Sequence, residues 1–551
     1  MIKSIAIGND DFKEIRENDS LFIDKTDFIK DIIDNDSKVL LFPRPRRFGK
    51  TLNMSMLKYY FDVELESQNL FDGLKIMNYG DKYLNEMNKY PVISLTLKES
   101  KKGTYEEFIS FYQKIISDLY RKYMFLLDSD LILDIDKKYI MKCINMQEKE
   151  QLSLALSNLS YMLEKYYNEK VIVLLDEYDA PILESYLKGY YNECITFMRE
   201  VFSSTFKGNL SLKKGVITGI LRVSKEGMFS GANNIKIYNV TDANFSSSFG
   251  FTEEEVKEVL NEYQLSDRFN EIKKWYDGYN FCGNTIYNPW SILNFLEDSN
   301  HNLSVYWANT GGTDLLRKLI YSRRNESLLE EYHKLLDTNK VIGVNLDLNM
   351  DLRSLETSRN TIWTLFMLAG YLTPTDNINS LYKNITLRIP NIEIKENLTN
   401  ICIKWFNNNI SGSNYIEEDL LNNNMEEFKQ VFSKIVEESF SYYDVDRRYG
   451  ENFYHAFVMG LLYSGSNNFK ITSNREAGFG RYDLLMRPRN KSCNNAYIIE
   501  FKSIENNSFD ETIEKAFKQI DDKKYEAELQ EYHVTKIVIV FKYKEVKIEI
   551  R

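Results

Sequence analysis

One short stretch near the N-terminus constrains the fold more than any other part of this sequence. Residues 39–42 (Val-Leu-Leu-Phe) are an apolar, strand-forming run, and a loop rich in proline and arginine follows and ends at Gly49. Lys50 and Thr51 come next, and apolar residues then recur at helical spacing as far as residue 60. Strand, loop, Gly-Lys-Thr and helix occur in the order of a P-loop, where a helix N-terminus presents backbone N–H groups to phosphate oxygens. The sequence therefore predicts an α/β domain built around a phosphate-binding loop.

The loop departs from the usual P-loop pattern at its first position. The pattern G-x-x-x-x-G-K-[ST] requires glycine at position 44, where this chain has Arg44. We expect the loop to follow a different path, with arginines replacing some of the backbone donors. Lys50 is expected to reach the β- and γ-phosphates and Thr51 to ligate Mg²⁺. The alternative for Gly-Lys-Thr alone is an exposed turn that enters a helix. The loop residues predicted to bind the nucleotide are Arg46, Arg47, Phe48, Gly49, Lys50 and Thr51.

A second motif, Val171–Asp179, is typical of the partner strand of such a loop. Five apolar residues predict a buried parallel strand, and Asp176 and Glu177 stand at its C-terminal end, where α/β sheets bind ligands. Asp176 is predicted to hold Mg²⁺ through water, and Glu177 to polarise the water that attacks the γ-phosphate. The alternative is a core strand that ends in a solvated acidic turn.

Two further runs complete the expected sheet. Residues 92–97 and 215–220 predict strands, and the second contains Thr218 near its end. A strand inserted between the loop strand and the acidic strand, with a polar residue ending the next, is typical of ATPases that use a glutamate base. Because the sequence contains no Asn-Lys-x-Asp segment for reading guanine, ATP is favoured over GTP. Arg222 is equally compatible with a charge that neutralises the γ-phosphate and with a structural ion pair.

The C-terminal region predicts a β-hairpin with charged residues on one face. Residues 481–486 and 496–502 are the expected strands, and the asparagines at 490–495 lie in the expected turn. Glu500 and Lys502 are two residues apart, so their side chains share a face, and the hairpin brings Asp483 beside Glu500. The two carboxylates would bind Mg²⁺, and the lysine would orient or activate water, as phosphodiester hydrolysis requires. The alternative for Glu-x-Lys alone is a cross-strand ion pair.

Several motifs taken together resemble a bacterial AAA-ATPase-like family. They are Phe22-Ile-Asp-Lys-Thr26, Arg44-Pro-Arg-Arg-Phe-Gly-Lys-Thr51, Leu175-Asp-Glu-Tyr-Asp179, Thr218-Gly-Ile-Leu-Arg-Val-Ser224, Phe229-Ser-Gly-Ala-Asn-Asn234, Trp275-Tyr-Asp-Gly-Tyr279 and Tyr287-Asn-Pro-Trp290. This resemblance covers nearly the whole chain and implies that Arg44 is a family trait. It also implies a C-terminal PD-(D/E)XK nuclease-like domain. Gly480-Arg-Tyr-Asp483, the hairpin and a helix with Gln519 and Tyr525 match that superfamily, although Tyr482 stands where its name has proline.

The composition of the sequence limits the cellular compartment and the kinds of binding partner that we expect. At 551 residues the chain is long enough for several domains, and 43% hydrophobic residues suffice for globular burial. Five scattered cysteines without a Cys-x-x-Cys pair favour a reducing compartment and argue against zinc. The N-terminus lacks the apolar core of a signal peptide, and no apolar run is long enough to span a bilayer, so we expect a cytoplasmic protein without membrane contact. The net charge of −11 argues against non-specific coating of DNA but leaves room for a local basic groove.

The predicted organisation has three parts: an AAA-ATPase-like P-loop domain at 1–295, a helical lid or connector at 296–430, and a nuclease-like domain at 431–551. In the middle part, residues 363–373 predict a buried helix that turns into a strand, and the asparagines at 407–409 and 422–424 predict helix breaks. Near the end of the first part, Glu255 stands at the capping-box position after Thr252. The cofactors expected are ATP and Mg²⁺.

The first functional hypothesis is an ATP-regulated, Mg²⁺-dependent nuclease whose partner is nucleic acid, with DNA preferred. The alternative is a nucleotide-dependent binding or signalling switch that does not cut. Retention of Asp483, Glu500 and Lys502 together favours cutting. A homo-oligomer is left open, since ATPases of this broad class often complete their site with a neighbour.

Overall fold

The computed structural model divides the chain into two compact units, which we describe separately. The first consists of Met1–Thr310 with Ile342–Ile394, and the second of Gly311–Val341 with Lys395–Arg551. The three predicted segments, 1–295, 296–430 and 431–551, stay predictions. The residues that the structure describes are 3–221, 234–307, 328, 331–332, 335–336, 338–348, 350–356, 358–376, 378, 382–409, 413–441, 458, 462, 468–473, 476–477, 480–481, 483–489, 494–504, 507–523, 529, 531–542 and 545–551.

A five-stranded parallel sheet organises the first unit. Its strands are β1 (Val39–Pro43), β2 (Val92–Thr96), β3 (Val171–Asp176), β4 (Leu212–Gly219) and β5 (Ile235–Ile237), in the order β2-β3-β4-β1-β5. Every residue of β1 and β3 is buried, as expected of continuous apolar runs in a parallel sheet. A strand does lie between the loop strand β1 and the acidic strand β3, but it is β4, from the run predicted at 215–220. The run at 92–97, which precedes the acidic strand in the sequence, instead forms the edge strand β2 beside β3.

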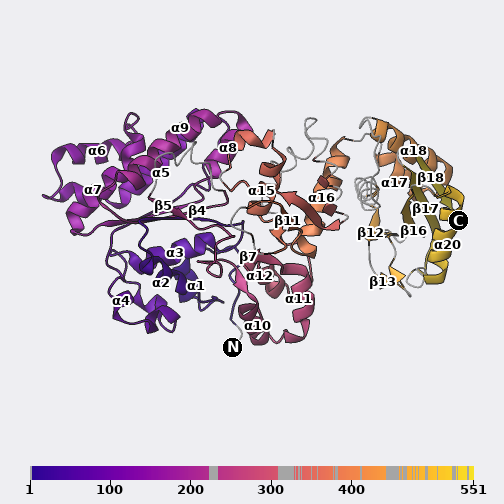
Figure 1. Cartoon of the computed structure of the whole chain (residues 1–551), viewed down its shortest axis with the longest axis horizontal. Coiled ribbons are helices and arrows are strands. Elements are labelled where there is room, and N and C mark those ends of the chain that lie inside the picture. Colours follow the sequence, from indigo (N-terminus) through magenta and orange to yellow (C-terminus); the bar gives the residue numbers. More distant parts are fainter. Residues whose placement is uncertain are drawn as a thin grey trace. The chain divides into compact units, whose positions relative to one another are not determined.

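Helices cover both faces of this sheet. They are α1 (Phe12–Glu17), α2 (Asp27–Asp34), α3 (Lys50–Phe61), α4 (Asp81–Leu84), α5 (Tyr105–Lys122), α6 (Asp134–Ile144), α7 (Ala155–Tyr167), α8 (Ala180–Lys188) and α9 (Tyr191–Phe202). Figure 1 shows α1–α4 on one face and α5–α9 on the other. Among the described residues, no helix has both the length and the apolarity needed to cross a membrane.

A smaller α/β region follows within the first unit. Its elements are β6 (Phe251–Thr252), α10 (Glu253–Glu262), α11 (Phe269–Tyr276), β7 (Tyr279–Phe281), β8 (Asn284–Tyr287), α12 (Pro289–Glu297), β9 (Lys340–Val344, shared with the second unit), α15 (Arg359–Ala369), β10 (Thr373–Pro374) and β11 (Ile385–Arg388). The strands form two sheets, β6-β8-β7 and β10-β11-β9. The capping box of Thr252 and Glu255 is confirmed, as is the buried helix α15 that leads into a strand. Gly278, in the predicted turn, has φ of 100°, and a Cβ there would lie 2.2 Å from the carbonyl oxygen of Pro390, so only glycine fits.

The second unit contains a mixed five-stranded sheet with helices. Its elements are α16 (Ile392–Asn409, shared with the first unit), α17 (Ser413–Leu421), α18 (Met425–Ser441), β12 (Phe469–Ser473), β13 (Glu476–Ala477), β14 (Gly480–Arg481), β15 (Leu484–Pro488), β16 (Asn495–Ser503), α20 (Phe509–Lys523), β17 (His533–Lys542) and β18 (Glu545–Ile550). The sheet order is β12-β15-β16-β17-β18, with β16 and β17 parallel and joined through α20. Ile513, Ala516, Phe517 and Ile520 of α20 pack into the core beneath these strands.

One sequence expectation for these elements needs correction, and another is confirmed. The asparagines at 407–409 are the last residues of α16, and those at 422–424 lie between α17 and α18, so both predicted helix breaks are confirmed. The strand predicted at 481–486 is not continuous. β14 ends at Arg481 and β15 begins at Leu484, which leaves Asp483 in a bend just before the paired strand.

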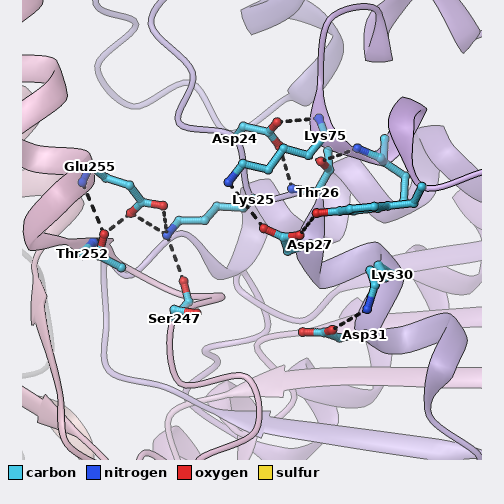
Figure 2. A network of polar contacts seen from close by, with 12 residues as sticks. Asp24, Lys25, Thr26, Asp27, Lys30, Asp31, Lys75, Ser247, Thr252 and Glu255 are labelled. Carbon is cyan, nitrogen blue, oxygen red and sulfur yellow. Dashed lines mark hydrogen bonds and ion pairs between the residues drawn. The ribbon is translucent and has the colours of Figure 1, made fainter.

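The motif at residues 22–26 provides a polar contact between the N-terminal segment and α10. This contact, the Lys25 clasp, consists of Lys25, Glu255 and Ser247. Lys25 Nζ donates to both carboxylate oxygens of Glu255 at 2.7 Å and to the carbonyl oxygen of Ser247 at 2.9 Å (Figure 2). Burial lowers the pKa of Lys25, and the charge of Glu255 opposes this shift. Glu255 also accepts a hydrogen bond from the backbone N–H of Thr252, so one carboxylate both caps α10 and neutralises the lysine. This family motif therefore has a structural role here.

We expect Lys25→Met to lower the free energy of unfolding of the first unit by about 2–3 kcal/mol, because Glu255 would keep its charge in a largely buried position without a cation. The control is Lys30→Met, since Lys30 pairs with Asp34 at 3.2 Å on the surface and such pairs contribute at most about 1 kcal/mol. Urea denaturation followed by tryptophan fluorescence measures both variants. Equal losses in the two would contradict a special role for the Lys25 clasp.

Candidate functional site

The loop between β1 and α3 is built as a phosphate-binding helix entry. Gly49 precedes α3 with φ of 79°, a left-handed conformation that glycine adopts without strain. Among the described residues, no side chain caps the first turn of α3. Its N-terminal N–H groups and the positive end of its dipole are therefore suited to an anion.

Lys50 is held inside this loop. Its side chain is almost fully buried, and Nζ donates to the carbonyl oxygens of Pro45 at 3.0 Å and Arg44 at 3.3 Å. Nζ also lies 3.6 Å from Glu177 Oε1. The structure thus brings together the predicted phosphate-binding lysine and the predicted general base.

Asp176 is bracketed by two hydroxyl groups from neighbouring elements. Thr51 Oγ1, on α3, donates to Asp176 Oδ2 at 2.7 Å, and Thr218 Oγ1, on β4, donates to Asp176 Oδ1. Burial raises the pKa of Asp176, as does the nearby charge of Glu177, while the two hydroxyl bonds act in the opposite direction. The predicted Mg²⁺ residues Thr51 and Asp176 therefore lie in direct contact, and Thr218 joins them.

Glu177 adopts an unusual backbone conformation. Its φ of 53° lies in the left-handed region, which costs a non-glycine residue about 1–2 kcal/mol. Hydrogen bonds on both sides hold this turn, because Tyr178 N donates to Thr218 O at 3.1 Å and Ala180 N donates to Glu177 O at 3.1 Å. The strained turn directs a partly exposed carboxylate to Lys50 at the mouth of the loop.

Arg44, which replaces the first glycine of the motif, is a structural residue. It is fully buried, and its guanidinium donates to the backbone carbonyl oxygens of Pro43 (2.9 Å), Tyr238 (2.6 Å) and Phe245 (3.1 Å). Burial lowers its pKa to about 9. Since both terminal nitrogens of the buried Arg44 guanidinium donate to the protein's own backbone, the expectation that loop arginines replace backbone donors to phosphate does not hold for Arg44.

The smaller α/β region contacts three further residues of the loop, Arg46, Arg47 and Phe48. The Arg47 guanidinium lies 3.8 Å from the ring centroid of Trp290, and Trp307 Nε1 donates to the carbonyl oxygen of Arg46 at 3.5 Å. The Phe48 ring packs edge-on against Tyr279, with centroids 5.0 Å apart. The loop therefore takes its shape from two parts of the unit.

Asp179 is a residue of this site that the sequence analysis did not assign. It is fully buried, and Oδ2 accepts hydrogen bonds from the backbone N–H groups of Ile220 (2.9 Å) and Leu221 (2.8 Å), just beyond β4. Burial raises its pKa to about 6, with the charge of Glu177 acting in the same direction. A Cβ at Gly219 would lie 2.6 Å from Asp179 Oδ1, so glycine is required there. The only feature of the sequence that could have indicated Asp179 was its position two residues after Glu177.

The predicted phosphate-binding residue Arg222 lies outside the described residues.

In the second unit, the predicted hairpin brings its charged residues together. β15 and β16 pair with Leu484 opposite Ile499, and Asp483 Oδ2 accepts a hydrogen bond from Phe501 N at 2.9 Å. Lys502 Nζ donates to Glu500 Oε1 at 2.8 Å and lies 4.0 Å from Asp483 Oδ2. The predicted convergence of Asp483, Glu500 and Lys502 is present in the structure.

Gln519 of α20 completes this group. Its Nε2 donates to Glu500 Oε1 at 2.5 Å. The family resemblance had drawn attention to Gln519, but it was not among the predicted catalytic residues. Glu500 thus receives one charged and one neutral donor on the same oxygen.

Glu500 is fully buried, and burial raises its pKa to about 7, with the charge of Asp483 adding to the rise and Lys502 opposing it. Its other oxygen, Oε2, has no hydrogen-bond partner among the described residues. A buried carboxylate oxygen without a donor is costly and fits a cation ligand. In the described ranges no group of three or more His, Cys, Asp or Glu side chains surrounds a common point. Two carboxylates are the protein ligands that Mg²⁺ commonly takes, with water for the rest.

Comparison with known proteins supports a nucleotide-binding domain in the N-terminal part of the chain and a nuclease-like domain in the C-terminal part. Residues 6–229 match the AAA-ATPase-like family, described as "Predicted AAA-ATPase", and residues 449–550 match the PD-(D/E)XK nuclease superfamily. A protein of Azotobacter chroococcum mcd 1, described as "Uncharacterized protein in vnfD 5'region", is 27% identical over 404 residues, or 72% of this chain and 69% of the relative. The chain therefore carries an AAA-ATPase-like domain and a nuclease-superfamily domain, as the sequence motifs predicted.

Proposed function

From these two domains, we propose that the protein binds and hydrolyses ATP and cleaves nucleic acid in a Mg²⁺-dependent reaction, with ATP state regulating cleavage. The observation that carries the proposal is the pair of charged groups, Lys50 with Glu177 and Asp483 with Glu500 and Lys502, each gathered from separate elements of its own unit. DNA is the preferred substrate class. Among the described residues, the free thiols of Cys143, Cys194 and Cys282 support a reducing, cytoplasmic setting.

In the first unit, each residue has a distinct proposed role. Lys50 would leave the carbonyl oxygens of its own loop to bind the phosphates, aided by the first-turn N–H groups of α3. Thr51 and Asp176 would hold Mg²⁺, and Glu177 would orient and deprotonate the attacking water. The remaining loop residues, Arg46, Arg47, Phe48 and Gly49, stay candidate nucleotide-binding residues that also shape the loop. Arg222 keeps its sequence-based role as a candidate phosphate ligand.

In the second unit, Asp483 and Glu500 would hold Mg²⁺ through carboxylate oxygens, including Glu500 Oε2, for which the described part of the chain offers no hydrogen-bond partner. When bound, the ion polarises the phosphoryl oxygen of the substrate. Lys502 would orient or activate the attacking water, and Gln519 would fix the rotamer of Glu500. A buried site of this kind strengthens each charge interaction relative to bulk water.

The first prediction tests nucleotide binding against turnover. Lys50→Ala should remove most of the ATP affinity, because the phosphates lose their main cation. Glu177→Gln should bind ATP yet hydrolyse it about 10²–10⁴-fold more slowly, because general-base assistance is typically of that size. Titration calorimetry and phosphate release measure the two quantities. Equal ATP affinity in the wild type and Lys50→Ala would contradict the assignment of the loop.

A second prediction tests the nuclease site. Glu500→Ala should abolish cleavage of plasmid DNA, single-stranded DNA and RNA in Mg²⁺ or Mn²⁺, and leave ATP hydrolysis intact. The control is Glu545→Ala, an exposed glutamate at the start of β18 in the same sheet, which should cut like the wild type. Undiminished cutting by Glu500→Ala would remove the site assignment. Nucleic-acid binding without any cutting by the wild type would favour the switch without cleavage.

The third prediction concerns regulation. If ATP stabilises one state of the protein, linked equilibria typically shift by about 1–3 kcal/mol, or about 5–150-fold. Glu177→Gln with bound ATP should therefore change the cleavage rate in one direction, and Lys50→Ala should remain at the nucleotide-free rate. Equal rates for both variants and the wild type, with and without ATP, would mean that the two domains are merely joined.

A further inference from the structure

Two tryptophans of the smaller α/β region contact the arginines of the P-loop. The Arg47 guanidinium stacks on Trp290 at 3.8 Å, a cation–π distance, and the Arg46 carbonyl accepts from Trp307 Nε1 at 3.5 Å. The two tryptophans are themselves linked, because Trp290 Nε1 donates to the carbonyl oxygen of Tyr306, the residue before Trp307, at 3.1 Å. A movement of residues 46–47 of the loop would therefore alter the contacts of both tryptophans.

The Arg47 guanidinium is placed so that it can exchange its contact with Trp290 for a contact with phosphate. Its φ of 67° is strained for a non-glycine residue, by about 1–2 kcal/mol, so the stack on Trp290 holds a conformation that the backbone alone disfavours. The residue is exposed. Partial burial and the charge of Arg46 lower the pKa of its guanidinium, and the charges of Asp10 and Glu177 act in the opposite direction. Phe48 next to it is buried against Tyr279, which anchors the loop just beyond the arginine. A phosphate group in the loop would compete with the tryptophan face for this guanidinium.

One buried carboxylate connects both tryptophans to the helix that leaves the unit. Glu393 is fully buried, and its Oε2 accepts from Ser291 Oγ at 2.7 Å, while its Oε1 accepts from Trp307 N at 2.9 Å. Ser291 follows Trp290 in the first turn of α12. Both donors are neutral, so the position of this carboxylate depends on keeping both hydrogen bonds.

Glu393 is the second residue of α16, and this helix belongs to both units. Residues up to Ile394 lie in the first unit and residues from Lys395 in the second, which carries Asp483 and Glu500. A helix transmits a change at its first turn more directly than a loop does, because its backbone hydrogen bonds are continuous.

We propose that Arg47, Trp290, Ser291 and Glu393, with Arg46 and Trp307 as a parallel contact, form a relay by which nucleotide in the P-loop alters the first turns of α16. In the structure, Arg47 stacks on Trp290, and Ser291 of α12 donates to Glu393. When the phosphates of the nucleotide take the Arg47 guanidinium, Trp290 loses its partner, and the hydrogen bonds from α12 to Glu393 weaken. This relay rests on the proposed ATP binding and names the route of its regulation.

The test is hydrogen exchange by mass spectrometry on the full chain, with and without the β,γ-imido analogue of ATP and Mg²⁺. In the wild type, the analogue should speed exchange in residues 290–297 and 392–400 by about fivefold or more, the lower end of typical coupling. Trp290→Leu should show the faster exchange without nucleotide and no further change with it. Glu393→Gln, which can keep only one of the two acceptors, should respond at 290–297 but not at 392–400.

The matched control is Trp275→Leu, the same substitution on α11 in the same region, which should respond like the wild type. Calorimetry with the same analogue separates the failures. Absence of binding to the wild type would overturn the proposed function and the relay together. Binding without a change at 392–400, or a change there that persists unaltered in Trp290→Leu, would overturn the relay alone.

Discussion

The hydrogen-bonded group of Thr51, Asp176 and Thr218 is the constraint on which the first unit depends. Its hydrogen bonds join α3, which follows the P-loop, to the acidic strand β3 and to β4, the neighbouring strand. They therefore hold these three elements together at the carboxyl edge of the sheet. A carboxylate buried there would be expensive without donors, and the two hydroxyl groups supply them. Because both hydroxyls can also turn to a cation or to water, the same contacts that stabilise the edge of the sheet prepare it for Mg²⁺.

The sequence predicted the local parts of both sites and missed those that depend on distant segments. β1, β3 and β4 were predictable because buried parallel strands are continuous apolar runs, and the pairing of Asp483 with the Glu500 strand followed from hairpin register. The partners of Arg44 lie about 200 residues along the chain, at Tyr238 and Phe245, and no local pattern announces them. The sequence showed that arginine replaces glycine at position 44, but it did not show which groups the Arg44 side chain contacts.

Four buried carboxylates show how differently such groups are accommodated. Asp176 is held by hydroxyls and Asp179 by backbone N–H groups, so each stabilises a particular turn or strand end. Glu393 is held by one hydroxyl and one backbone N–H from separate segments, which makes it a junction. In both Asp179 and Glu500, two donors reach one oxygen, and the other oxygen has no hydrogen-bond partner among the described residues. Glu500 differs from the other three because one of its donors, Lys502, is charged. The charge of the donor, more than burial, separates the candidate catalytic carboxylate from the structural ones.

The arginine-rich loop changes what a P-loop requires of the rest of the protein. A glycine-rich loop can take its path from its own backbone freedom, whereas Arg44 and Arg47 need partners outside the loop to hold theirs. Arg44 finds backbone carbonyls at Tyr238 and Phe245, and Arg47 finds the ring of Trp290. The geometry offered to a nucleotide is therefore a joint property of the parallel sheet and the smaller α/β region. A ligand that alters such a loop must also alter its partners, because the partners are what keep the loop in place.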